Sequence, residues 1–197
     1  MIYEHKDFFI ACIPKTGSKS TSSWCIRNNL TPVTEYMFNK PVFATMRNNK
    51  ERVLSGMAED LYYRTLVIHN LDNDLPLPDN FEDLYRQCVL DWLDNPVHPI
   101  VPTQVHYANL NSYFKNLVDL NTVHWIHYKD IGIMDQLINK YMKCDTGLSP
   151  VEDEFLTFET KRPSKDILYS MMLENTCVMN WFELYVSQQY EPTYIHL

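Results

Sequence analysis

Phe8-Phe9-Ile10-Ala11-Cys12-Ile13 is a continuous apolar run, and the polar turn Pro14-Lys15-Thr16-Gly17-Ser18-Lys19-Ser20-Thr21 follows it directly. An apolar run of this length is typical of a strand buried on both faces, as in a parallel sheet covered by helices. Pro14 ends the strand, and residues 18–30, with hydroxyl side chains in their first turn, are predicted as a helix. A strand that leads through a short turn into a helix is the building unit of an α/β sheet.

Strands and helices are predicted to alternate along the rest of the chain. The further predicted strands cover residues 41–46 and 122–127. The further predicted helices run through residues 53–61, from an Asp79 cap through 81–92, over 130–143, and from a Ser164 cap to residue 190. This alternation predicts an α/β fold of three layers, in which a mostly parallel sheet is flanked by helices. With no internal repeat or linker in the sequence, residues 1–197 are expected to form one domain.

The composition is that of a globular chain of 197 residues, 45% of them hydrophobic, with a formal net charge of −8. The negative charge disfavours a protein that grips nucleic-acid backbone. Every apolar run is far shorter than the roughly 18 residues of a membrane span. The five cysteines are widely spaced and form no C-x-x-C pair, which indicates reduced core thiols and neither a disulfide framework nor a zinc site. Because the N-terminus resembles no signal or transit peptide, we expect a cytoplasmic protein. The oligomeric state is left open.

The turn between the first strand and the first helix has the features of an anion site. Ligands of open α/β sheets bind where strands end and helices begin, and the N–H groups and dipole of a helix N-terminus favour a phosphate. The spacing is not that of a Walker A loop, which needs G-x-x-x-x-G-K-[ST]. Lysines bring positive charge, hydroxyls bring donors, and the glycine allows close approach of the backbone. The residues predicted to contact the anion are Lys15, Thr16, Gly17, Ser18, Lys19 and Ser20.

The order of residues 14–20 resembles the 5′-phosphosulfate loop of the sulfotransferase superfamily, whose members use 3′-phosphoadenosine 5′-phosphosulfate (PAPS). Family members usually carry Thr or Ser where this chain has Lys19. After the next predicted strand, residues 46–55 resemble the family's 3′-phosphate motif, written R-[DN]-P-x-x-R-x-x-S. Arg47 and Ser55 match the two side chains that hold the 3′-phosphate in the family, and Arg52 matches the intervening arginine.

Two further departures and two supporting stretches complete the resemblance. Asn49 stands where the 3′-phosphate motif usually has proline. Residues 127–131 resemble the family's Y-E-D-L segment after a late strand, and residues 180–185 are similar to the terminal helix of carbohydrate-type members, with Asn180 in place of the usual Asp. The resemblance therefore covers nearly the whole chain, although only the two phosphate motifs are specific.

The resemblance implies a P-loop NTPase-like sulfotransferase fold and transfer of a sulfonate group from PAPS to a hydroxyl or amine of a carbohydrate or small-molecule acceptor. Lys15 is the residue expected to stabilise the charge on the leaving group, and no metal is expected. Lys161 and Arg162 match a basic loop that closes over the nucleotide in the family. His98, in a Pro-rich loop similar to the H-x-x-P-Q element of carbohydrate sulfotransferases, is the expected general base.

Several alternatives stay open at this stage. His106, His69 and the Glu59-Asp60 pair are the other candidates for the base, whereas His124 and His127 alternate along a predicted strand and are expected to serve packing. The acceptor pocket is expected from residues 62–80 and 94–113. Two other functions compete with sulfonate transfer: a P-loop-like nucleotide kinase, and a degenerate nucleotide-binding protein without catalysis.

Overall fold

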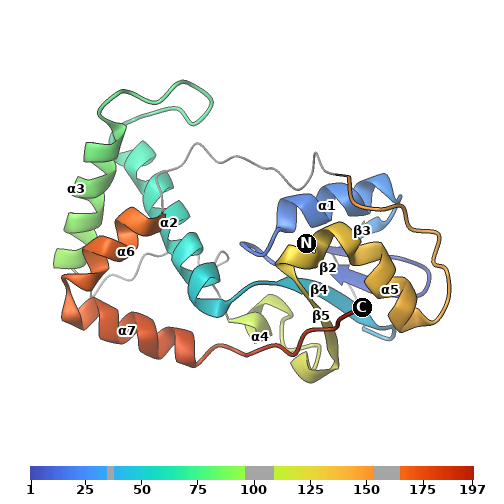
Figure 1. The fold of residues 1–197 in the computed structure, drawn as a ribbon. Coiled ribbons are helices and arrows are strands. Elements are labelled where there is room, and N and C mark those ends of the chain that lie inside the picture. Colours follow the sequence, from blue (N-terminus) through green and yellow to red (C-terminus); the bar gives the residue numbers. More distant parts are fainter. Residues whose placement is uncertain (35–37, 96–108, 153–164) are drawn as a thin grey trace. The chain divides into compact units, whose positions relative to one another are not determined.

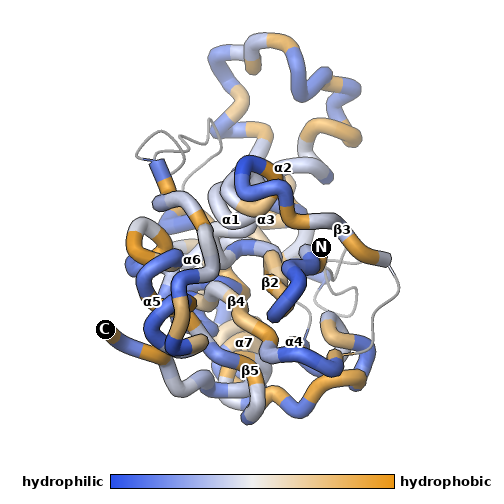
Figure 2. The backbone as a smooth tube through the Cα atoms, turned by 90° about the vertical axis from the view of Figure 1, so that its right-hand side faces the viewer, coloured by the Kyte–Doolittle hydropathy of each residue, from blue (hydrophilic) through white to orange (hydrophobic). Residues whose placement is uncertain are grey.

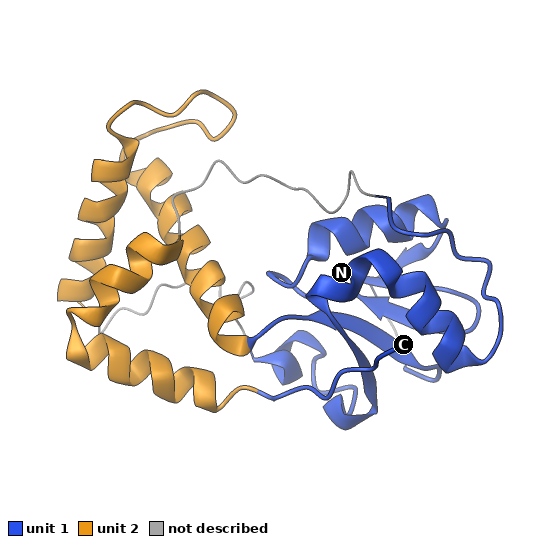
Figure 3. Ribbon diagram, in the orientation of Figure 1, with its two compact units in different colours: residues 1–48, 109–159, 190–197 blue, residues 49–108, 160–189 orange. Residues whose placement is uncertain are grey.

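The computed structural model describes residues 1–34, 38–95, 109–152 and 165–197 (Figure 1). Within these residues the chain is α/β, with a five-stranded mixed sheet and seven α-helices. The chain divides into two compact units (Figure 3): unit 1 comprises residues 1–48, 109–159 and 190–197, and unit 2 comprises residues 49–108 and 160–189. Unit 1 contains the sheet, and unit 2 is helical. The expectation of one domain over residues 1–197 stays a prediction.

The sheet of unit 1 has the strand order β3-β1-β2-β4-β5. Its parallel part consists of β2 (Phe9–Ala11), β4 (Val42–Met46) and β5 (Val123–His127). The remaining strand pairs are antiparallel, because β1 (Ile2–Glu4) runs against both β2 and β3 (Thr31–Val33). The expectation of a mostly parallel sheet is therefore wrong. Only four residues connect β1 to β2, and a connection that short can join antiparallel strands but not parallel ones.

Each face of the sheet is covered, which gives unit 1 three layers. One face presents Tyr3, Ile10, Phe43 and Ile126, and the helices α1 (Ser18–Arg27) and α5 (Met134–Met142) pack on it. The opposite face packs against α4 (Leu110–Tyr113) and the 3₁₀ turn η2 (Leu120–Thr122). Alternate strand residues point to opposite faces, so strands that are apolar at every position bury both faces. Figure 2 shows this hydrophobic character along β2 and β4.

In the part of unit 2 that the structure describes, four helices share one apolar core. They are α2 (Asn49–Ile68), α3 (Phe81–Asp94), α6 (Lys165–Leu173) and α7 (Thr176–Ser187). Helix α3 contributes Tyr85, Cys88 and Trp92 to that core. The side chains of this core stabilise unit 2, since burying one large apolar side chain contributes about 1.5–3 kcal/mol.

Several helix boundaries differ from the predictions. The last helix is not continuous, because the Asn175 side chain accepts a hydrogen bond from the N–H of Val178 and so begins a new helix there. Helix α3 begins after Asn80, one residue later than the predicted Asp79 cap. The segment expected to begin a helix at residue 130 is first a 3₁₀ turn, η3 (Tyr128–Ile133), before α5.

Candidate functional site

The turn between β2 and α1 is fixed to the neighbouring strand by buried hydroxyl groups. The Thr16 hydroxyl donates to the carbonyl of Ile13 at 2.8 Å, and the Thr21 hydroxyl donates to the carbonyl of Gly17 at 3.1 Å. Both hydroxyls also lie within hydrogen-bond distance of the Thr45 hydroxyl on β4, at 3.4 Å and 3.3 Å. The predicted anion loop is therefore held in place by β4. Thr16 as a whole residue is fully buried, so its hydroxyl and its backbone serve the packing of the loop and are not exposed to a ligand.

Gly17 has a backbone conformation that favours glycine. Its φ is +84°, in the left-handed region, and a Cβ added there would lie 2.3 Å from Cδ1 of Ile131. Ile131 belongs to η3, which follows β5. Gly17 is also the N-cap of α1, whose first turn contains no acidic residue. The glycine thus brings the loop against the turn after β5, and the N-terminus of α1 presents a positive electrostatic end beside it.

Lys15 is held in an unfavourable backbone conformation. Its φ is 65°, a left-handed value that L-residues with a side chain rarely adopt. Backbone strain of this kind costs about 1–3 kcal/mol and clusters at functional sites. A glycine at this position would avoid the strain but would also remove the ammonium group, so we infer that the side chain of Lys15 is needed. Its half-buried side chain stands in the middle of the loop, between Pro14 and Gly17.

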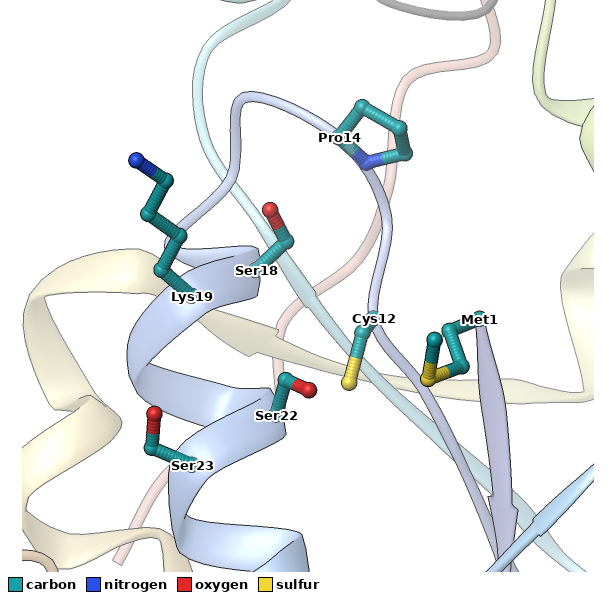
Figure 4. Close-up of a pocket in the computed structure, with 7 residues that line it drawn as sticks. All are labelled: Met1, Cys12, Pro14, Ser18, Lys19, Ser22 and Ser23. Carbon is teal, nitrogen blue, oxygen red and sulfur yellow. The ribbon is translucent and has the colours of Figure 1, made fainter. Parts of the chain in front are cut away.

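A pocket of about 460 Å³ adjoins the loop (Figure 4). Two residues of the loop, Pro14 and Ser18, line the pocket. The other lining residues are Met1, Cys12, Lys19, Ser22 and Ser23. Figure 4 shows the three serines and Lys19 extending from α1, with Cys12 and Pro14 on the segment that leaves β2. The serine hydroxyls and the Lys19 ammonium group stand beside Met1, Cys12 and Pro14, so the pocket offers a ligand both polar and apolar contacts.

Arg47 lies at the end of β4, next to this loop. The carbon of its guanidinium lies 4.9 Å from the centroid of the Tyr128 ring, and Tyr128 is the first residue of η3 after β5. Because β2, β4 and β5 are parallel neighbours, the turn after β2, Arg47 and Tyr128 all follow carboxyl ends at one edge of the sheet.

This edge is also where the path of the chain changes direction. After β2 the chain re-enters the sheet at β3 on one side, and after β4 it re-enters at β5 on the other. The edge of the sheet between β2 and β4 is thus a topological switch point, and open α/β sheets bind their ligands at such points. Sequence order alone did not show that these two strands are neighbours.

The other residues of the 3′-phosphate motif lie in unit 2. Ser55 is half-buried on α2, and its predicted partnership with Arg47 stays a prediction. Arg52 is buried inside unit 2, where its Nη2 donates to Oε1 of Gln189 at 3.0 Å. Burial lowers the pKa of Arg52 to about 10. Its contacts are those of a residue that joins α2 to the end of α7.

Of the candidates for the general base, the structure describes Glu59, Asp60 and His69. His98 and His106 lie outside the described residues, as do the basic residues Lys161 and Arg162. Glu59 and Asp60 are buried on α2, and His69 is exposed just after that helix. The general base therefore stays a prediction.

The packing role expected for His124 and His127 is confirmed. The His124 ring lies 3.8 Å from the Tyr141 ring, and the His127 ring lies 4.9 Å from Tyr128 and 5.0 Å from Tyr194. Both histidines thus pack against aromatic rings of unit 1.

Two residues of the site escaped sequence reasoning. Thr45 is the one hydroxyl in an otherwise apolar strand, and that isolated polar residue near a strand end was a usable signal. Ile131 gave no signal, because its contact with Gly17 depends on the packing of η3.

Comparisons with protein-family models, with curated proteins and with solved structures found no match for this chain. In the part of the chain that the structure describes, no group of three or more His, Cys, Asp or Glu side chains is arranged to hold a metal ion. No helix within the same residues has the length and apolar character needed to cross a membrane. All five cysteines are free thiols; Cys12, Cys25 and Cys88 are buried, as expected of core thiols, whereas Cys144 and Cys177 are exposed.

Proposed function

We propose that this chain is a PAPS-dependent sulfotransferase that transfers a sulfonate group to a hydroxyl or amine of a carbohydrate or other small molecule. Both phosphate motifs support the proposal, because the loop of residues 14–20 and Arg47 follow neighbouring parallel strands at a switch point. A nucleotide with phosphates at two separate positions needs two separate anion contacts. The loop of residues 14–20 (the β2 loop) and Arg47 follow neighbouring strands, and this is the single observation that carries the proposal.

The β2 loop suits the 5′-phosphosulfate end of the nucleotide. The N-terminus of α1 and the backbone around Gly17 offer N–H donors to phosphate oxygens. Arg47 suits the 3′-phosphate, because a guanidinium presents several N–H groups in a plane that matches phosphate oxygens. Tyr128 supports the guanidinium from one side, and stacking on a ring does not use the N–H groups in that plane.

In the transfer step the acceptor oxygen or nitrogen forms a bond to sulfur, and the bond from sulfur to the bridging oxygen of the 5′-phosphate breaks. The electron pair stays on that oxygen, so negative charge grows on the departing 3′,5′-ADP. The ammonium group of Lys15 would stabilise this charge, a contribution worth about 10²–10³ in rate. The proton of the acceptor passes to a general base, for which His98 remains the candidate. The pocket beside Pro14 and Ser18 would receive the acceptor, in place of the pocket expected from residues 62–80 and 94–113.

Thermal unfolding with a panel of nucleotides tests the proposal. We expect 3′,5′-ADP to raise the unfolding temperature more than AMP does, because only 3′,5′-ADP fills both anion contacts. A ligand present at 100 times its Kd stabilises the fold by about 2.7 kcal/mol. In the variant Arg47→Ala, 3′,5′-ADP should lose about 1.5–3 kcal/mol of binding energy, while AMP should be little affected.

The other outcomes discriminate the competing functions. Equal shifts from AMP and 3′,5′-ADP would contradict two separate anion contacts. A larger shift from ATP with magnesium would favour a kinase. Tight binding of 3′,5′-ADP without transfer of labelled sulfonate to any of a set of sugars and amines would favour a nucleotide-binding protein that lacks catalysis.

A further inference from the structure

A second pocket, of about 640 Å³, lies in unit 1 between α5 and the C-terminal segment. Its walls contain two lysines and a histidine and no carboxylate. The lining residues are Leu137, Lys140, Tyr141, Lys143, Ile195 and His196. In a chain with a net charge of −8, this is a local excess of positive charge, and local charge is what attracts a charged ligand.

Both walls of this pocket are fixed by contacts in the described residues. On one wall the Tyr141 ring lies 3.8 Å from His124 and 5.5 Å from Phe43, which are paired residues of β5 and β4. On the other wall the N–H of Ile195 donates to the carbonyl of Trp125 at 2.8 Å. The pocket is therefore pre-formed, as ligand sites usually are.

One hydrogen bond joins the two walls. The Lys140 ammonium donates to the carbonyl of His196 at 3.3 Å. Figures 1 and 2 both show the C-terminal end of the chain beside α5. An ammonium group has three donors, so Lys140 can make this bond and still contact an anion.

Lys143 adds a second cation to the wall of the pocket. It is the C-cap of α5 and has a φ of 57°, in the left-handed region where glycine or asparagine is usual. A lysine there is strained by about 1–2 kcal/mol, and within the described residues its ammonium group pairs with no carboxylate. This conformation ends α5 and leaves the Lys143 cation at the wall of the cavity.

We propose that this pocket binds an organic anion that carries a phosphate or sulfate ester. Lys140 and Lys143 contact the ester oxygens through charge-assisted hydrogen bonds. The volume of the pocket exceeds what a bare oxyanion needs and accommodates an attached group the size of a sugar ring. None of its lining residues belongs to the β2 loop, and neither Arg47 nor Tyr128 lines it. This proposal is therefore independent of the proposed function.

Titration calorimetry on the full chain tests the site, with glucose 6-phosphate, glucose 6-sulfate, inorganic phosphate and glucose as probes. At least one ester should bind in the submillimolar to millimolar range, and inorganic phosphate more weakly. Glucose should not bind. Comparison of the two esters identifies the preferred anion. Amide shifts in nuclear magnetic resonance spectra should concentrate at residues 137–143 and 195–196.

The variant Lys143→Gly removes the charge and the backbone strain together, so it should fold at least as well as the wild type. Binding of the ester should nevertheless weaken at least five-fold. Lys6→Ser removes the same charge from an exposed side chain outside the pocket and should leave binding unchanged.

The proposal is overturned if the esters bind no better than glucose, or if Lys143→Gly binds them as well as the wild type does. Loss of ester binding in the variant Arg47→Ala would also overturn it, because the ester would then occupy the loops after β2 and β4. The Lys143→Gly comparison needs no nucleotide, so failure of this proposal and failure of the proposed function are seen separately.

Discussion

The guanidinium of Arg47 rests on the ring of Tyr128, with 4.9 Å from its carbon to the ring centroid. The two residues follow adjacent parallel strands, β4 and β5, whose paired residues extend to Met46 and His127. Tyr128 is itself supported, since its ring lies 4.9 Å from that of His127. A long and flexible side chain is thereby confined to few rotamers before any ligand arrives. Such pre-organisation reduces the ordering that binding would otherwise require.

Replacing Tyr128 should therefore weaken binding of the 3′-phosphate alone. Cation–π contacts contribute about 0.5–2 kcal/mol, so Tyr128→Leu should raise the Kd for 3′,5′-ADP by roughly two- to thirty-fold. Tyr128→Phe keeps the ring face and should bind like the wild type. The Kd for AMP, measured by calorimetry, should be the same in all three proteins. A parallel loss of AMP binding would indicate a general distortion of the site.

Lys15→Gly should separate stability from function. Glycine relieves a left-handed strain of about 1–2 kcal/mol, offset by about 0.5–1 kcal/mol of extra backbone entropy in the unfolded chain. The free energy of unfolding should thus stay level or rise by up to about 1 kcal/mol, while sulfonate transfer falls by about 10²–10³. Urea unfolding and turnover measurements check the two halves.

Lys115→Gly is the matched control, because Lys115 also lies in unit 1 and has a φ of 52°. It should gain similar stability and keep full activity. If Lys15→Gly retained turnover as well, Lys15 would not be the group that stabilises the leaving charge.

Gly17→Ala should destabilise unit 1 through one identifiable atom. The new Cβ would meet Cδ1 of Ile131 at 2.3 Å and would also sit on a backbone with φ of +84°. Overpacking of this kind costs about 1–3 kcal/mol, and the left-handed strain adds about 1–2 kcal/mol. Gly147→Ala has a similar backbone strain with open space around it. Its free energy of unfolding should therefore fall only by the left-handed strain of about 1–2 kcal/mol.

A double-mutant cycle isolates the contact. Ile131→Val removes Cδ1 and alone should cost about 0.5–1.5 kcal/mol. The double variant should recover part of the lost free energy of unfolding, so its total loss should be smaller than the sum of the losses in the two single variants. Strict additivity would show that the loop after β2 does not depend on the turn after β5.

Much of unit 1 follows from apolar runs in the sequence. The strands within residues 8–13, 41–46 and 122–127 form where predicted, because both their faces are buried. β1 and β3 have three residues each, and β3 exposes two of them, so neither has a periodicity that could be recognised. Their positions depend on pairing with a neighbour.

The site was predictable as a list of residues but not as an arrangement. The motif around Gly17 marked the loop because glycine, lysine and hydroxyl groups between a strand and a helix have few other uses. It could not show that the Thr16 hydroxyl turns inward to Ile13 and Thr45. Arg52 looked like a motif residue, yet it is buried against Gln189, because the burial of a helix face depends on helices far along the chain.

The pH dependence of stability should reveal His124. Burial lowers the pKa of His124 below its ordinary value of 6.5. As pH falls below 6.5, the unfolded chain binds a proton at this site before the folded chain does, so stability is lost until the pH has passed the lower, folded pKa. Above pH 6.5 the site contributes no pH dependence. His124→Phe removes the titration and keeps an aromatic ring against Tyr141 and Phe43.

Urea unfolding at pH 7.5 and at pH 5.0 gives the required comparison. The wild type should lose more free energy of unfolding between the two pH values than His124→Phe does. His5, whose pKa is also lowered by burial, is present in both proteins, so its contribution cancels in the difference. If both proteins lost the same free energy, His124 would have equal proton affinity in the folded and unfolded chains, and its packing between Tyr141 and Phe43 would not desolvate the imidazole.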